Sequence, residues 1–392
     1  MSTVAGAILA TGAFAAEKCS PEGLSSVETN VVCSEKELGS LSSNWSNLNQ
    51  VDEFLLLSKN GLTNVDNLKN LKEVGKMLKL SGNELTSLKG LKNLESAGLL
   101  DLSSNYNLKS LDGLNKLKNV KKNIDARWTG IKNVDGLESL ETVGDTLHFE
   151  ATSLKNIDGL KNLKEVGSAL RLMKNNLTNV DGLINLTKVG GKDPRTSIND
   201  KLDLSDNELT NINGLRNLKS VSGDLNLDGN KLTNIDAISQ LTKLKRISLH
   251  ENDLTNLNAL RNLKEVGSWI SVYRNFNLTD ISGLSNVVFT DPRYQRIQID
   301  KRNYVGKLSA NSFICKNFGN GVLKIEQPYD VWKTDANGKK LKDADGRLIL
   351  ESGGKAKMED YSLYCEGTPP KVAAPVQEPA PTEKRGIFSI FG

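Results

Sequence analysis

Leucines recur at fixed intervals over the middle of the chain, from about Phe54 to Val305. Three of the repeating units read LKLSGNELTSLKGLKNLESAG from Leu78, LDLSDNELTNINGLRNLKSVSG from Leu202 and LNLDGNKLTNIDAISQLTKLK from Leu225. The opening L-x-L places both leucines on one face of a short strand and the intervening residue on the other face. In the arm that follows, a leucine recurs every third residue, which predicts 3₁₀ turns or extended chain rather than a long helix.

One polar position marks every unit, just after the strand. The marker residues are Asn60, Asn83, Asn105, Thr129, Thr152, Asn175, Asn207, Asn230, Asn252 and Asn275. Successive markers are 22 to 24 residues apart, except for a gap of 32 between Asn175 and Asn207, and such a period is typical of leucine-rich repeats. The Asn amide is expected to pair with backbone groups that would otherwise be buried and unpaired. A Thr hydroxyl makes fewer such bonds, so the stretch around Thr129 and Thr152 is expected to be looser.

A single unit of this kind cannot bury its own leucines, so the units must stack. Each neighbour supplies one wall of the core, and the two end units need caps. The Gly of the recurring V-G or V-S-G is expected to make a tight corner before the next strand. The pattern therefore predicts an α/β solenoid. It would be a leucine-rich repeat horseshoe of about 10 to 11 coils spaced by about 4.8 Å, with a parallel β-sheet on its concave face.

The repeating unit resembles that of bacterial internalin-type leucine-rich repeat proteins. Its V-G-x-x-L-x-L corner is also similar to the repeat of receptor L domains. The likeness covers about residues 54–305. It implies recognition of a protein or a glycan, commonly at a bacterial surface, although a fold does not by itself define a function.

Segments of different composition flank the repeats. Residues 1–16 are apolar and end near Ala13-Phe14-Ala15, which predicts a signal peptide and export. Residues 17–53 are expected to form an N-terminal cap, residues 54–305 the repeats, and residues 306–367 a β-rich C-terminal cap. In that cap, Asn337-Gly338 and Asp345-Gly346 favour hairpin turns over a calcium-binding loop. The Pro-rich residues 368–392 predict an extended, disordered tail.

All four cysteines lie outside the repeats, with Cys19 and Cys33 near one end and Cys315 and Cys365 near the other. In an exported protein, an even number of cysteines indicates disulfides. The ends of a stiff solenoid stand far apart, whereas a disulfide joins Cα atoms that are about 4.4 to 6.8 Å apart. The pairs are therefore expected within each cap, Cys19 with Cys33 and Cys315 with Cys365. Four reduced thiols in a cytosolic protein are the alternative.

Composition argues against several classes of function. The chain has 51 Lys and Arg against 47 Asp and Glu, a net charge of only +4, so neither nucleic acid nor an anionic membrane is expected as a partner. With two histidines and no glycine-rich phosphate loop, neither a nucleophile with its base nor a metal-ligand cluster can be assembled. No enzyme activity, cofactor or metal is therefore expected. After the first 16 residues, no stretch approaches the roughly 20 apolar residues of a transmembrane helix.

The outward positions of the strands hold the candidate ligand-binding residues. In most coils these positions are small or polar, as at Asp203 and Ser205. Two groups of coils differ, and they hold Arg127, Trp128, His148, Glu150, Arg171, Met173 and Lys174 in the first group and His250, Glu251, Tyr273 and Arg274 in the second. Because interfaces are enriched in Trp, Tyr, Met and Arg, these residues are predicted to bind a ligand. The alternative is that they are scattered surface residues or are covered by a cap.

The sequence thus favours a monomeric, non-enzymatic module that binds a protein and is secreted, on the cell surface or periplasmic. Two alternatives stay open. One is a glycan-binding module, favoured by Asp and Asn rows beside Trp128 and Tyr273. The other is a cell-envelope scaffold attached through the apolar tip at Ile387–Phe391. The insertion GGKDPRTSINDK, Gly190–Lys201, predicts a surface loop over one rim that either contacts the ligand or is neutral.

Overall fold

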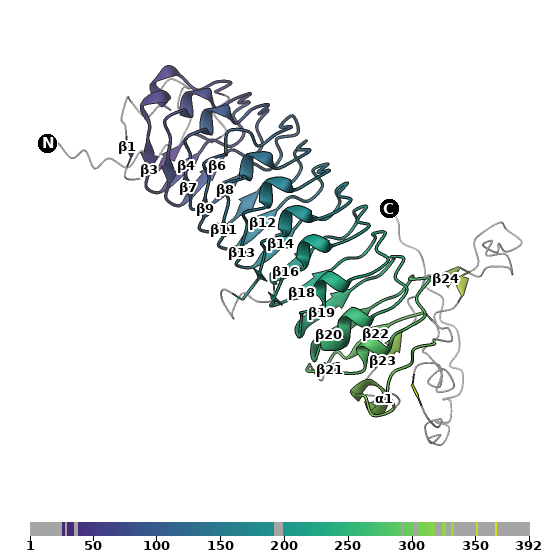
Figure 1. Cartoon of the computed structure of the whole chain (residues 1–392). Helices are drawn as coiled ribbons and strands as arrows, with labels where there is room; N and C mark the ends of the chain where they lie inside the picture. Colours follow the sequence, from purple (N-terminus) through teal and green to yellow (C-terminus); the bar gives the residue numbers. More distant parts are fainter. Residues whose placement is uncertain are drawn as a thin grey trace, which may run out of the picture.

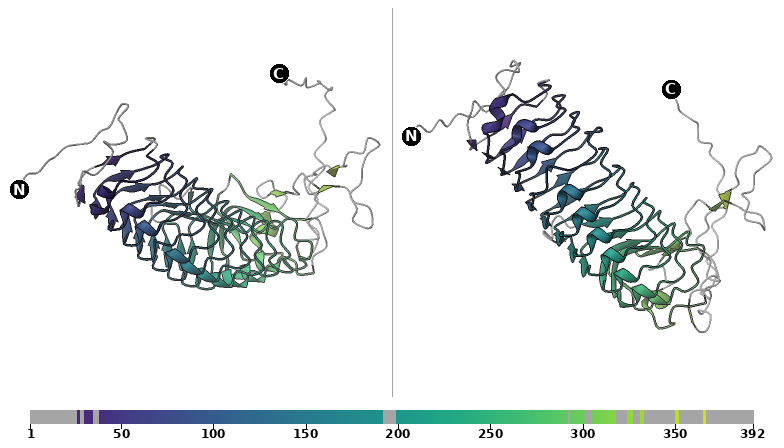
Figure 2. Two further views of the ribbon diagram at one scale, coloured as in Figure 1. Left: turned by 90° about the horizontal axis from the view of Figure 1, so that it is seen from above. Right: turned by 45° about the horizontal axis from the view of Figure 1, so that its top comes forward.

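The chain winds into coils that stack into one curved solenoid (Figures 1 and 2). The structure is a computed structural model, and it describes residues 26–27, 30–34, 38–191, 199–291, 293–300, 305–317, 324–326, 331–332, 350–351 and 365–366. Most coils consist of a short strand, a turn and an arm, as the repeat predicts. The predicted leucine-rich repeat solenoid is therefore confirmed.

The first strand of each coil joins a parallel sheet, here called the front sheet, whose order follows the chain. Equivalent residues of successive coils are paired, so that Leu147 lies beside Ile124 on one side and Leu170 on the other. This register stacks every inward leucine on its counterpart in the next coil. The strands are β2 (Val31–Val32), β4 (Phe54–Leu56), β6 (Met77–Lys79), β8 (Leu100–Asp101), β10 (Ile124–Asp125), β12 (Thr146–His148), β14 (Ala169–Arg171), β16 (Lys201–Asp203), β18 (Asp224–Asn226), β19 (Lys243–Ser248), β20 (Glu265–Ser271), β22 (Arg296–Gln298) and β23 (Lys324–Glu326), with β21 (Val288–Phe289) paired to β20.

At the V-G positions, where the sequence predicts only a tight corner, the chain forms a second parallel sheet, the back sheet. Its strands are β1 (Ser26–Val27), β3 (Gln50–Val51), β5 (Glu73–Val74), β7 (Ser96–Ala97), β9 (Asn119–Val120), β11 (Thr142–Val143), β13 (Glu165–Val166), β15 (Lys188–Val189) and β17 (Ser220–Val221). A Cβ on Gly75 would lie 1.9 Å from the carbonyl oxygen of Asp52 in the preceding coil. This glycine is therefore needed for close stacking of the coils, not for a left-handed turn.

The arms contain the expected 3₁₀ turns. They are η2 (Ser43–Asn47), η3 (Asp66–Leu68), η4 (Lys89–Leu91), η5 (Asp135–Leu137), η6 (Asp158–Leu160), η7 (Asp181–Leu183), η9 (Asn213–Leu215), η10 (Asp236–Ile238), η11 (Asn258–Asn262) and η12 (Ser282–Leu284). The glycine of L-x-G-L sits inside these turns. A Cβ on Gly159 would lie 2.0 Å from the carbonyl oxygen of Val134. The repeat glycines thus set how closely one arm lies on the next.

Two rows of asparagines join successive coils. Asn83 represents the buried marker row: its Nδ2 donates to the carbonyl oxygens of Leu80 (2.8 Å) and Leu57 (2.9 Å), and its Oδ1 accepts from the backbone N–H of Asn60 (2.8 Å). The predicted role of the marker is confirmed. A second row occupies L-x-N-L in the arm, where Asn93 Nδ2 donates to the carbonyl oxygen of Lys69 (2.8 Å). This back row is exposed and was not expected from the sequence.

Both rows are interrupted in the coil that contains Thr129. The Oγ1 of Thr129 donates a single hydrogen bond, to the carbonyl oxygen of Ala126 (2.9 Å). In the next coil, Thr152 Oγ1 donates to Asn175 Oδ1 (2.7 Å). Ser139 stands at the back-row position of the Thr129 coil. The expectation of fewer bonds at Thr129 is confirmed, and the expected looser packing of this coil remains a prediction.

The core is one continuous column of leucines. In the coils of Thr129 and Thr152, a smaller and a larger side chain replace two of these leucines. Inward positions such as Leu102 and Leu172 are fully buried. Two adjacent coils instead place Ala126 and Phe149 at this position, both fully buried, and the strand register sets them side by side. The large ring in one coil therefore compensates for the small side chain in the other.

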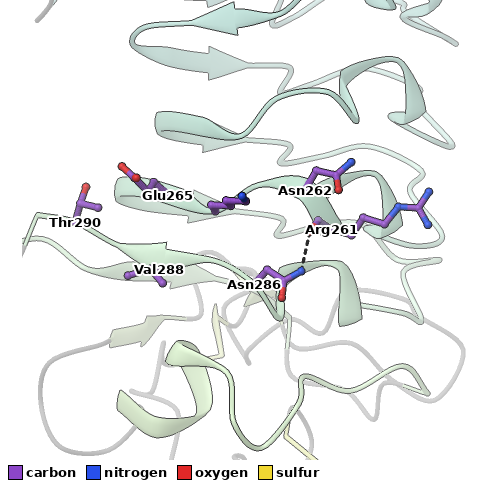
Figure 3. A pocket seen from close by; sticks show the side chains of 7 residues that line it. Arg261, Asn262, Glu265, Asn286, Val288 and Thr290 are labelled. Carbon is purple, nitrogen blue, oxygen red and sulfur yellow. Dashed lines mark hydrogen bonds between the residues drawn. The ribbon is translucent and has the colours of Figure 1, made fainter.

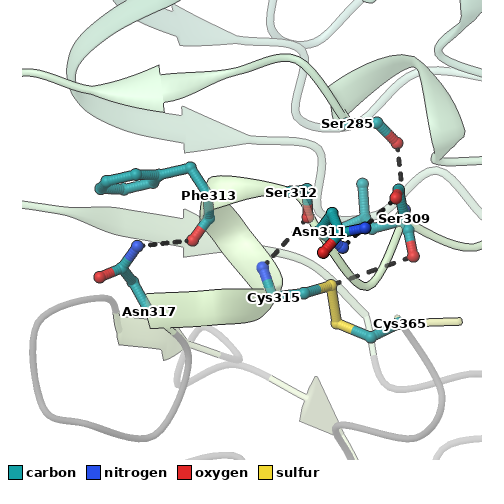
Figure 4. The surroundings of a disulfide bond; sticks show 9 residues. Ser285, Ser309, Asn311, Ser312, Phe313, Cys315, Asn317 and Cys365 are labelled. Carbon is teal, nitrogen blue, oxygen red and sulfur yellow. Dashed lines mark hydrogen bonds between the residues drawn. A yellow bond between two sulfur atoms is a disulfide. The ribbon is translucent and has the colours of Figure 1, made fainter. Parts of the chain in front are cut away.

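The C-terminal end of the described solenoid carries α1 (Phe313–Asn317), β24 (Val331–Trp332) and β25 (Leu350–Glu351). The expected disulfide between Cys315 and Cys365 is present, with Cα atoms 6.0 Å apart (Figure 4). Cys33 is also disulfide-bonded, and Cys19, its expected partner, lies outside the described residues. The predicted signal peptide, the Asn-Gly and Asp-Gly turns and the Pro-rich tail lie outside them as well.

Removing the Cys315–Cys365 disulfide is expected to lower the free energy of unfolding by about 2 to 4 kcal/mol, because the bond closes a loop of 50 residues in the unfolded chain. Urea unfolding of the Cys315→Ser, Cys365→Ser double variant tests this and leaves Cys33 untouched. An unchanged unfolding midpoint would show that this end contributes nothing to the cooperative unit.

Candidate functional site

Three adjacent strands of the front sheet bring the first group of predicted residues together. Asp125, His148 and Arg171 are register partners on β10, β12 and β14, and Asp203 follows on β16. Here the term central cluster means the first group, Arg127, Trp128, His148, Glu150, Arg171, Met173 and Lys174. The period of the repeat predicts this adjacency because equivalent positions of neighbouring coils become neighbours in the sheet.

Arg127 and Trp128 form one side of the central cluster. An Arg127 terminal nitrogen lies 2.7 Å from Asp125 Oδ2, and hydrogen bonding to Asp125 raises the pKa of Arg127 above its ordinary value. The guanidinium also lies over the Trp128 ring, 5.1 Å from its centroid. Trp128 is 47% exposed. It therefore presents a large, partly immobilised aromatic surface to solvent.

A hydrogen bond between His148 and Glu150 and an ion pair between Glu150 and Lys174 run through the middle of the cluster. Burial lowers the pKa of His148, whose Nε2 lies 3.2 Å from Glu150 Oε2, so the imidazole is neutral at pH 7. Lys174 Nζ lies 3.2 Å from Glu150 Oε1. Burial of Glu150 opposes its ionisation, but hydrogen bonds from Lys174 and His148 prevail and lower its pKa. Glu150 is therefore an ionised, fully engaged carboxylate.

The second group of predicted residues is more enclosed than the sequence suggests. The rings of His250 and Tyr273 are stacked, with centroids 5.5 Å apart, and the Arg274 guanidinium lies 5.6 Å from the Tyr273 centroid. Arg274 also pairs with Glu251 at 3.4 Å. Tyr273, which the sequence predicts to bind a ligand, is only 4% exposed and so offers little surface to one. Its neighbours cover the ring.

Burial also affects Asp228, the outward residue next to His250. Burial raises the pKa of Asp228, although Asp228 Oδ2 accepts from Ser248 Oγ and Asp228 Oδ1 accepts from the backbone N–H of His250, both at 2.7 Å. Asp203 and Ser205, which were expected to face solvent, are 2% and 8% exposed. Short polar side chains on closely spaced strands therefore satisfy one another and leave little surface for a ligand.

Trp128, Lys174, Glu251 and Arg274 share a left-handed backbone conformation, with φ between 54° and 58°. The same conformation occurs at the residue before the marker in other coils, as at Lys59. It is therefore a feature of the repeat and not a sign of function. Gly82 and Gly229 at equivalent positions were the sequence signal for it.

Two of the exposed aromatic residues that the sequence prediction missed directly follow a marker. Tyr106 and Phe276 are 67% and 73% exposed and directly follow the markers Asn105 and Asn275. The other coils carry charged, polar or glycine residues there, as at Lys231 and Gly61, so an aromatic at this position was the available signal. Tyr106 belongs to the coil that precedes Trp128.

The ends of the predicted insertion are held by Asp200, which is 2% exposed. Its carboxylate accepts from the N–H of Gly191 (2.8 Å) and from Ser168 Oγ (2.9 Å). Residues 192–198 lie outside the described part of the chain, so the predicted loop itself stays a prediction.

A hollow on another part of the surface contains none of the predicted residues. It is lined by Arg261, Asn262, Lys264, Glu265, Asn286, Val288 and Thr290 (Figure 3). Asn286 Nδ2 donates to the carbonyl oxygen of Arg261 (2.8 Å), which is a back-row bond of the solenoid. Within the described ranges, no three His, Cys, Asp or Glu residues gather as metal ligands. No described helix has the length and apolar character needed to span a membrane.

No family model and no curated protein matches the chain. Its coils nevertheless combine the L-x-L strand, the buried marker and the 3₁₀ arm in one stacked sheet. The chain is a leucine-rich repeat protein. Solved structures similar to this leucine-rich repeat protein include an internalin from Listeria monocytogenes, with 18% identity, 76% of this chain and 86% of that chain covered, and a TM-score of 0.44.

Two further solved structures have lower TM-scores. An internalin C2 from the same organism has 20% identity and a TM-score of 0.35, with 64% of this chain and 83% of that chain covered. A leucine-rich repeat protein from Leptospira interrogans has 22% identity and a TM-score of 0.25, with 76% of this chain and 95% of that chain covered.

Proposed function

We propose that this protein is a non-enzymatic recognition module that binds a protein partner on the front sheet, at the central cluster. One observation carries the proposal: three adjacent coils lack the small polar side chains that most coils have on the outward face of the front sheet. They hold larger residues there instead, which are Arg127 and Trp128 in the first coil, Glu150 in the second, and Arg171 and Met173 in the third. Interfaces concentrate their energy in a few such aromatic, Arg and Met anchors.

The role of each side chain follows from its surroundings. Trp128 is the anchor, because nearly half of its surface is exposed and Arg127 limits its motion. Met173 is partly exposed and offers an adaptable apolar contact two coils further along the front sheet. Glu150 and Lys174 are paired with each other and contribute orientation more than affinity.

The proposal also includes a location outside the cytoplasm and a monomeric protein. The Cys315–Cys365 disulfide supports the location, because such bonds persist in oxidising compartments. A glycan ligand is the second candidate, favoured by the exposed rings of Tyr106 and Trp128 in adjacent coils.

Replacing Trp128 with alanine is expected to weaken binding of the partner about 30-fold or more, which corresponds to the roughly 2 kcal/mol of an interface anchor. The partner is first identified by photo-crosslinking from benzoylphenylalanine at Met173 of the full chain, with the same probe at the exposed arm residue Lys219 as control. It is then purified, and its affinity is measured by calorimetry.

Tyr294→Ala is the matched control, since Tyr294 is 57% exposed but lies outside the central cluster. Equal loss for both variants, or equal crosslinking from Met173 and Lys219, would contradict the proposal. Binding of purified full chain to a glycan array, abolished by Trp128→Ala, would instead support the glycan candidate.

A further inference from the structure

Arg171, at the centre of the front sheet, is a cation without a partner in the described part of the chain. Its side chain makes no hydrogen bond or ion pair with the described residues, and its Nε is buried without a hydrogen-bond partner. Its register partners are His148 on one side and Asp203 on the other. An unpaired, partly buried guanidinium is costly in the free protein, so its surroundings need a physical explanation.

The carboxylates around Arg171 are already occupied by other donors. Asp203 Oδ2 lies 2.5 Å from Lys201 Nζ, and its Oδ1 accepts from Ser205 Oγ at 2.7 Å. Glu150 accepts from both His148 and Lys174. Each of these two acids is therefore already paired with a cation on its own or the adjacent coil, and Arg171 has no carboxylate partner among the described residues.

The charges of this group leave room for one negative charge. Four cations, Arg127, Arg171, Lys174 and Lys201, stand against three carboxylates, Asp125, Glu150 and Asp203, which leaves one positive charge because His148 is neutral. Asp206, exposed at the position of Lys174 in the next coil, offsets this charge over the whole surface, so the positive charge is local to the unpaired Arg171. A single carboxylate suits this balance, whereas a phosphate dianion or a sulfated chain meets repulsion from the flanking acids.

We propose that Arg171 receives the carboxylate of an Asp or Glu side chain from the protein partner, in a bidentate pair on the front sheet. This inference rests on the proposed function and names the chemical group that the central cluster recognises in the partner. The planar guanidinium matches a carboxylate in two parallel hydrogen bonds. Met173, two residues further along the same coil, and the exposed ring of Trp128 favour an apolar residue near that acid in the partner.

Replacing Arg171 with methionine is expected to raise the stability of the free protein and to weaken its binding of acidic ligands. Arg171→Met removes an unpaired charge and keeps the aliphatic length of the side chain, so the free protein is expected to melt at a higher temperature than wild type. The same variant is expected to lose the preference for acidic ligands. Arg216→Met, at an exposed arm position, is the matched control and is expected to change neither property.

The probe is a random peptide library displayed on phage and selected on the full chain. Wild type and Arg216→Met are expected to enrich peptides with Asp or Glu beside an apolar residue, and Arg171→Met is expected to lose this enrichment. Selected peptides are then synthesised as Glu and Gln pairs. The Gln peptide is expected to bind wild type at least about tenfold more weakly than the Glu peptide does. Arg171→Met is expected to bind the two peptides equally well.

An acid preference that survives in Arg171→Met overturns the inference. The inference is also overturned if a sulfated oligosaccharide displaces the Glu peptide in an Arg171-dependent way, whereas the Gln peptide does not displace it. Peptides that depend on Trp128 without any acid preference overturn the inference and leave the proposed function standing. If no selected peptide depends on Trp128 or Arg171, both fail. Arg171→Gln replaces the Met variant if that variant does not fold.

Discussion

Replacing Asn175 with alanine is expected to lower the free energy of unfolding by about 3 to 5 kcal/mol, because several buried backbone groups lose their partners together. Asn175 is 7% exposed. Its Nδ2 donates to the carbonyl oxygens of Phe149 (2.6 Å) and Leu172 (3.0 Å), and its Oδ1 accepts from Thr152 Oγ1 (2.7 Å) and the N–H of Leu154 (3.1 Å). Equilibrium urea unfolding followed by circular dichroism measures the change.

Two comparison variants show whether burial of the paired groups is the cause. Asn162→Ala removes one back-row bond, from Nδ2 to the carbonyl oxygen of Glu138 (2.7 Å), at an exposed position and is expected to cost about 1 kcal/mol or less. Thr129→Asn gives the coil that is expected to be looser an asparagine marker, and this change is expected to stabilise it by about 1 kcal/mol. Similar losses for Asn175→Ala and Asn162→Ala would show that the marker row has no special role.

Phe149→Ala is expected to destabilise the protein by about 3 to 5 kcal/mol, the usual range when a fully buried ring leaves a cavity. The neighbouring inward residue is already small, since Ala126 lies beside Phe149 in the strand register. The cavity left by Phe149→Ala would therefore extend over two coils, and no leucine could fill it from the side of Ala126. Urea unfolding and hydrogen exchange in β10 and β12 measure the effect.

A double variant tests directly whether the Phe149 ring fills the space that the small side chain of Ala126 leaves. Phe149→Leu alone leaves a cavity, and Ala126→Leu alone overfills the core, which costs about 1 to 3 kcal/mol. Combining the two restores the leucines found in most coils, so the double variant is expected to be more stable than the sum of the single changes implies. Strict additivity would show that the two side chains do not share one space.

The residues of the candidate site were predictable in position but not in exposure. The period of the repeat was enough to put Arg127, Glu150 and Met173 in one row, because equivalent positions of stacked coils must meet. Exposure depends on side chains about one repeat away: Tyr273 is covered because His250 stacks on it, whereas Trp128 stays open. A pattern of residue types does not encode which of several neighbours turns toward a ring.

The sequence by itself determined the coil: L-x-L strands, buried asparagine markers, 3₁₀ arms and stacking, since each follows from local spacing and from the need of one unit to bury its leucines against the next. Only the tertiary structure decided the back sheet, the second asparagine row and the unpaired charge of Arg171. These features depend on distances between coils. Gly75 allows a close approach of two coils, and Asp203 pairs with Lys201 of its own strand instead of with its register partner Arg171.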